Sequence, residues 1–96
     1  MIDLDSNSLN FIKKTINDIL PDAKIIAFGS RINGKAKQFS DLDIAIDSGE
    51  KVDWHNLEKM KDKFAESTLR IMVDIHDYSS LNASFRKIVD QHKFIL

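Results

Sequence analysis

The sequence predicts a small α/β (α+β) domain, in which a mixed β-sheet is flanked by helices. Three observations lead to this class. The chain has 96 residues, which at about 100–200 residues per domain is one domain, expected to span residues 1–96. Helix-type and strand-type patterns alternate along the chain. A helical segment joins the second strand to the third, as a crossover between parallel neighbours would.

The first expected element is a helix over about residues 9–20. Its apolar residues recur at steps of three and four, and they are Leu9, Ile12, Ile16, Ile19 and Leu20. We expect Ser6, Asn7 or Ser8 to cap its start, and Pro21 to end it.

Two strands follow. Residues 24–28 (KIIAF) form a short apolar run before Gly29, which predicts a buried strand. Residues 30–37 are polar and predict a loop or a short helix. Residues 41–47 (DLDIAID) alternate strictly, so the leucine and isoleucines face one side and the aspartates face the other.

The second half of the chain repeats the helix and strand patterns. Asp53 can cap a helix that runs to about residue 65. Residues 70–76 (RIMVDIH) predict a third strand, with Asp74 and His76 on its polar face. We expect Ser79 or Ser80 to open a third helix. The apolar residues 94–96 predict either a short edge strand or an interface tail.

Composition excludes several classes of protein. Fourteen basic and 15 acidic residues give a net charge of −1, so we expect no direct nucleic-acid binding through phosphate contacts. The absence of cysteine excludes a disulfide framework and a thiol nucleophile, and it suits the reducing cytoplasm. No apolar run approaches the ~18 residues of a membrane span, so no membrane association is expected.

Three aspartates are candidates for metal binding. Asp41 and Asp43 lie two apart on one strand, so their side chains share a face. Asp74 lies on the polar face of the third strand, and the three carboxylates would meet if that strand pairs beside the second. Asp77 could replace Asp74, but it lies at the strand's end. His76 shares the face of Asp74 and could lie near the site, but a surface histidine is the preferred interpretation.

A glycine–serine turn supplies a candidate phosphate site. Gly29 lets the backbone approach a phosphate closely, and the N–H groups of Ser30 and Arg31 could point at an anion if a helix begins there. The Arg31 guanidinium adds a forked cation. Taken alone, this segment is better explained by an ordinary turn.

Taken together, these parts resemble the DNA polymerase β-like nucleotidyltransferase superfamily. The motif is G-S-R-x-x-G-x-x-x-x-x-S-D-L-D over residues 29–43, followed by the later strand aspartate Asp74. The sequence is most similar to the minimal nucleotidyltransferases (MNT domains, MntA-like antitoxins), from about residue 23 to residue 75. The resemblance implies a polymerase β-like palm fold.

The resemblance also implies roles for these residues. Gly29 and Ser30, with Arg31 beside them, would bind the phosphates of ATP or another NTP. Asp41 and Asp43 would bind two Mg²⁺ ions. Asp74 would be the third catalytic carboxylate, ligating a metal and helping to activate the acceptor hydroxyl, which attacks the α-phosphate while pyrophosphate leaves.

A partner protein is implied in the same way. Such domains are commonly encoded beside a helical HEPN protein, a toxin that some of them silence by adding AMP, and a homo-oligomer would also be possible. We therefore expect an adenylyltransferase-type antitoxin. Two alternatives remain open: a non-catalytic module that neutralises a HEPN partner by occlusion, and a nucleotidyltransferase acting on a small molecule.

Overall fold

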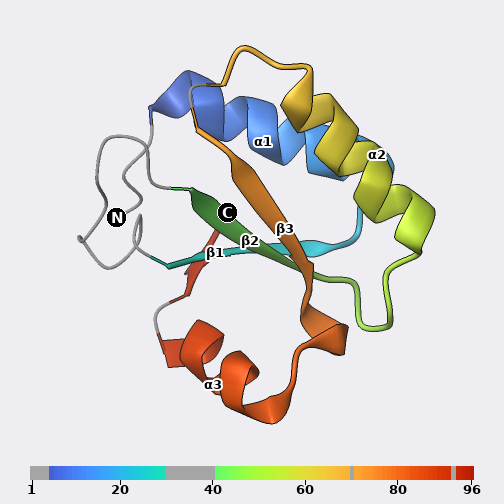
Figure 1. The fold of residues 1–96 in the computed structure, drawn as a ribbon, viewed down its shortest axis with the longest axis vertical. Coiled ribbons are helices and arrows are strands. Elements are labelled where there is room, and N and C mark those ends of the chain that lie inside the picture. The colour runs from blue at the N-terminus through green and yellow to red at the C-terminus, as the bar shows by residue number, and fades with distance from the viewer. Residues whose placement is uncertain (1–4, 30–40, 70, 92) are drawn as a thin grey trace.

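A mixed β-sheet forms the centre of the molecule (Figure 1). The computed structural model describes residues 5–29, 41–69, 71–91 and 93–96. Within them the sheet has the order β3-β2-β1-β4. Its strands are β1 (Lys24–Phe28), β2 (Leu42–Asp47), β3 (Val73–Asp77) and β4 (Phe94–Ile95).

The strand directions confirm the predicted mixed sheet. β1 pairs with β2 in antiparallel fashion, whereas β2 pairs with β3 in parallel. The parallel pair is connected through helix α2 (Trp54–Ala65), which is the crossover that such a pair requires.

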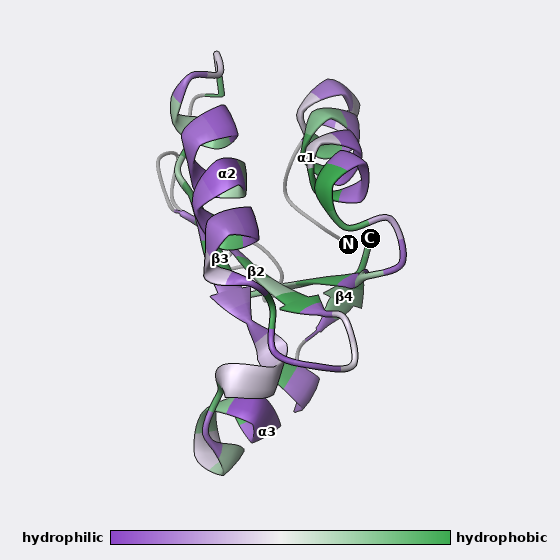
Figure 2. Ribbon diagram, turned by 90° about the vertical axis from the view of Figure 1, so that its right-hand side faces the viewer, coloured by the Kyte–Doolittle hydropathy of each residue, from purple (hydrophilic) through white to green (hydrophobic). Residues whose placement is uncertain are grey.

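Helices cover both faces of the sheet, as Figure 2 shows. Helix α1 (Ser6–Ile19) and α2 lie on one face, and helix α3 (Ala83–Gln91) lies on the other. Alternation along the strands divides the core accordingly. The larger cluster, on the α1 and α2 side, includes Ile12, Ile16, Ile25, Leu42, Ile44, Ile46 and Met60. The smaller cluster, on the α3 side, consists of Ile26, Phe28, Ala45 and Val89. Among the described residues, no helix has the length and apolarity needed to cross a membrane.

Two of the three expected helix caps are wrong. The cap of α1 is Asp5, whose side chain accepts the Ser8 N–H, and not one of the predicted residues 6–8. Asp53 caps α2 as predicted, accepting the His55 N–H at 2.8 Å. Ser79 and Ser80 do not open α3 but lie in a short 3₁₀ turn, η1 (Tyr78–Ser80), because their hydroxyls donate to Asp77. Helix α3 begins later, with the Asn82 side chain accepting the Phe85 N–H at 2.8 Å.

The third strand begins and ends later than the predicted 70–76. β2 begins at Leu42, and its register partner is Val73, so β3 starts where β2 offers a partner. The strand then continues to Asp77, opposite Ile46. The predicted alternation holds, since Ile75 is buried and Asp74 is exposed.

The apolar C-terminal segment was predicted to be either an edge strand or an interface tail, and it forms the edge strand β4. Phe94 pairs with Ala27 and Ile95 with Ile26, and the Leu96 N–H donates to Ile25 O at 2.9 Å. A contact between this segment and a second protein stays a prediction.

Asp77 has a structural position rather than the metal-binding one considered as an alternative to Asp74. Its carboxylate is buried and accepts hydrogen bonds from the Val52 N–H, the Ser79 N–H and hydroxyl, and the Ser80 hydroxyl. It thereby joins the segment before α2 to the turn after β3. Burial alone would raise the pKa of Asp77, but these hydrogen bonds outweigh it, so the pKa lies below its ordinary value of 3.8.

We expect Asp77→Asn to destabilise the fold at neutral pH by about 1–3 kcal/mol, because the amide cannot accept all of these bonds. A depressed pKa in the folded state stabilises the protein above the ordinary pKa of aspartate, and this contribution is lost as pH falls through the folded value. The gap between the two proteins in urea denaturation should therefore shrink as the pH is lowered below about 4.

The control is Asp62→Asn, which changes an exposed aspartate on α2 and should leave the unfolding free energy nearly unchanged. A gap between Asp77→Asn and the parent protein that is the same at pH 7 and at pH 3 would contradict the assigned role.

Candidate active site

Two acidic residues face each other across the parallel pair of strands. Asp43 of β2 is the register partner of Asp74 of β3, so both side chains emerge on the sheet face that α3 covers. The Asp43 side chain is 29% exposed and the Asp74 side chain is 55% exposed. The predicted alternation of each strand therefore brings two of the three candidate carboxylates together.

His76 completes a cluster with these two aspartates. Its Nε2 atom lies 3.3 Å from Asp74 Oδ2 and 3.8 Å from Asp43 Oδ1. One ligand atom from each of the three residues lies within 4.8 Å of the other two. The cluster thus offers two carboxylate oxygens and one imidazole nitrogen, a set of donors that can hold a divalent cation.

Aromatic packing holds the imidazole in this position. The ring of His76 lies 5.6 Å from the ring of Phe28 and 5.9 Å from that of Phe85, measured between centroids. Phe28 and Phe85 also contact each other edge to face, at 5.8 Å. The histidine is therefore part of the packing between the sheet and α3, and it is not the surface residue that the sequence suggested.

The two carboxylates raise the pKa of His76 above its ordinary value. Asp43 has the largest effect, and the charge of Asp74 adds to it, against partial burial that lowers the pKa.

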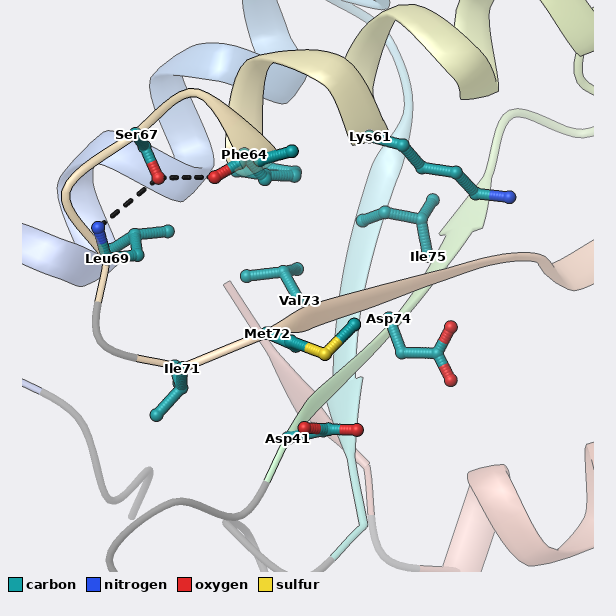
Figure 3. Close-up of a pocket in the computed structure, with 11 residues that line it drawn as sticks. Asp41, Lys61, Phe64, Ser67, Leu69, Ile71, Met72, Val73, Asp74 and Ile75 are labelled. Atoms are coloured by element: carbon teal, nitrogen blue, oxygen red, sulfur yellow. Dashed lines mark hydrogen bonds between the residues drawn. The ribbon is translucent and has the colours of Figure 1, made fainter.

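Asp41 is not part of this cluster but lines a pocket that Asp74 also borders. It is exposed and directly precedes β2. Together with Asp74 and Lys61 it lines a pocket of about 640 Å³ between β3 and the end of α2. Figure 3 shows both carboxylates at one end of this pocket, away from Phe64 and Leu69. This volume is within the range of small-molecule sites. Among the described residues, the three-residue cluster does not include Asp41.

Gly29 lies so close to Asp43 that a side chain at position 29 would displace the carboxylate. It follows β1, whose last residue Phe28 is the register partner of Asp43. A Cβ atom at position 29 would overlap Asp43 Oδ2, and the φ angle of +91° lies in the left-handed region. Ser30 and Arg31, the other predicted phosphate-binding residues, lie outside the described residues.

His76 is the residue at this site that sequence reasoning missed. Alternation placed it on the face of Asp74, which was the available signal. What the sequence did not reveal was that Phe28 and Phe85, from two other elements, hold its ring against the acids.

Comparisons with known proteins agree on one family. A family model described as "Polymerase beta, Nucleotidyltransferase" matches residues 10–96. The chain is 40% identical over 88 residues to the probable protein adenylyltransferase MntA of Haemophilus influenzae, covering 92% of this chain and 77% of that protein.

Solved structures give the same result. A toxin–antitoxin crystallised with AMP-PNP has a TM-score of 0.76 and 29% identity, and the match covers 90% of this chain and 69% of that chain. A mutant of the toxin–antitoxin MntA-HpeT has a TM-score of 0.75 and 26% identity, with the same coverage.

Gly29→Ala should disturb Asp43 and weaken the binding of a divalent cation. The added methyl group pushes the Oδ2 atom from its place, and the left-handed backbone costs a residue other than glycine about 1–2 kcal/mol. We expect a lower melting temperature together with a weaker Mn²⁺ titration by calorimetry.

Gly49→Ala is the matched control. Gly49 has a similar φ angle of +83°, but nothing lies within 4 Å of its added Cβ, so this variant should lose stability without losing cation affinity. Equal cation affinity in the two variants would contradict the contact between Gly29 and Asp43.

Proposed function

This chain belongs to the polymerase β family of nucleotidyltransferases, and from that membership we propose that it transfers the AMP group of ATP to a hydroxyl group on a toxin partner. It would act in the cytoplasm as the antitoxin of a toxin–antitoxin pair. The proposed partner is a HEPN-type protein.

The observation that carries the proposal is the pairing of Asp43 with Asp74 on adjacent parallel strands, beside the pocket that Asp41 lines. Two of the similar proteins support the choice of nucleotide: one is named a protein adenylyltransferase, and one was crystallised with AMP-PNP. The toxin–antitoxin structures support a toxin partner.

In the proposed reaction the acceptor hydroxyl oxygen forms a bond to the α-phosphorus of ATP. The bond between that phosphorus and the bridging oxygen to the β-phosphate breaks, and pyrophosphate leaves with the electron pair. We assign to Asp74, the more exposed of the facing carboxylates, the role of accepting the hydroxyl proton, as a general base would.

The family resemblance implies two Mg²⁺ ions, and the oxygen donors of Asp43 and Asp74 support this choice of metal, since Mg²⁺ prefers oxygen ligands from one or two carboxylates together with substrate phosphates. Asp41, Asp43 and Asp74 would hold these ions. When bound, the ions would neutralise charge on the phosphates and stabilise an in-line displacement.

The phosphates of ATP would lie at the end of β1. Gly29 carries no side chain and its backbone lies next to Asp43, and we assign phosphate contacts to Gly29, Ser30 and Arg31. Backbone N–H groups in such a turn are suited to an anion.

The test is Asp41→Asn combined with Asp43→Asn, which removes two charges with little change in volume. With the purified toxin partner and labelled ATP, we expect transfer to fall by roughly a hundredfold or more, because the metal site supplies several kcal/mol. The control is Asp47→Asn on the same strand, whose amide oxygen can still accept the Gly49 N–H.

Two outcomes would overturn the proposal. If the double variant protects cells from the toxin as well as the parent protein does, neutralisation occurs by occlusion. If label appears on a small molecule and none on the partner, the acceptor class is wrong.

A further inference from the structure

We propose that His76 is itself a metal ligand, so that the site accepts first-row transition ions such as Mn²⁺ and Co²⁺ through one nitrogen and two carboxylate donors. This inference rests on the proposed function, because it concerns the same cation site. It differs from the carboxylate-only ligand set that the family resemblance implies.

The distances between the donor atoms fit a shared ion. Ligand atoms that bind one ion at about 2.0–2.2 Å are themselves about 3.0–3.5 Å apart. The distance from Nε2 of His76 to Asp74 Oδ2, 3.3 Å, lies in this range, and the 3.8 Å distance to Asp43 Oδ1 needs only a small closing movement.

The imidazole is also held in position before any ion binds. The rings of Phe28 and Phe85 pack against it, and the side chain is 27% exposed. Its Nε2 atom faces the two acids, so little side-chain freedom would be lost on binding.

The second oxygen of Asp43 supports the same geometry. Oδ2 lies against Gly29, whereas Oδ1 faces His76. The carboxylate therefore lies between the glycine backbone and the imidazole, and the oxygen that faces His76 is the one available to an ion shared with it.

A competing role for His76 is that of a cation substitute, in which the protonated imidazole only holds the two carboxylates together. The two roles predict opposite effects of removing the ring. A ligand contributes most to ions that favour nitrogen, such as Co²⁺, and little to Mg²⁺, which favours oxygen. A cation substitute competes with every ion, so its removal would strengthen the binding of both.

The experiment compares the full chain with His76→Ala, without nucleotide, by calorimetric titration with Co²⁺ and with Mg²⁺. We expect the variant to lose tenfold or more in Co²⁺ affinity and less than threefold in Mg²⁺ affinity. His76→Gln, which restores most of the side-chain volume, should show the same selective loss. His55→Ala is the control, since His55 is exposed on α2.

Pulsed electron paramagnetic resonance of bound Mn²⁺ provides a direct readout of ligation. The ¹⁴N modulation from a coordinated imidazole should be present in the parent protein and in His55→Ala, and absent in His76→Ala. Absence of this modulation in the parent protein would overturn the inference, as would equal losses for Co²⁺ and Mg²⁺ or tighter binding of both ions by His76→Ala.

These readouts are independent of catalysis. If Mn²⁺ binds without the ¹⁴N modulation while AMP transfer proceeds, only the role of His76 fails. If the modulation is present but no transfer to a partner occurs, only the proposed function fails.

Discussion

The parallel pairing of β2 with β3 is the constraint on which the site depends. Its register sets Asp43 opposite Asp74 and places His76 on the same face. Two parallel strands need a crossover connection. Helix α2 and the segments on either side of it form that connection between β2 and β3. The buried carboxylate of Asp77 contributes by joining the start of that crossover to the turn after β3.

Two aspartates on one short strand, Asp74 and Asp77, have different surroundings because alternation sends them to opposite faces. Asp74 points toward the α3 side with Asp43, whereas Asp77 is buried and bonded to Val52 and two serines. The face that carries the acids has the smaller core, and its aromatic residues Phe28 and Phe85 support the imidazole beside them. His76 is therefore the residue that both packs against these aromatic rings and lies beside the two carboxylates.

The sequence was sufficient to predict the mixed sheet, β1 with its exact bounds, and the proximity of Asp43 and Asp74, because these follow from alternation and a helical crossover. The caps at Asp5 and Asn82 were missed because several neighbouring residues had similar capping propensity. The contacts of His76 were missed for a different reason: Phe28 and Phe85 belong to separate elements, so their approach depends on how α3 packs on the sheet.

Because Gly29 lies against Asp43, we expect position 43 to tolerate a longer side chain less well than position 74 does. The Asp43 carboxylate already fills the space in which a Cβ at position 29 would lie, so a side chain one methylene longer at position 43 has little room on the side of Gly29. The same extension at position 74 would enter solvent, because that side chain is half-exposed. Replacement of each aspartate by glutamate is therefore expected to have different consequences, and variation at position 43 is coupled to the size of the residue at position 29.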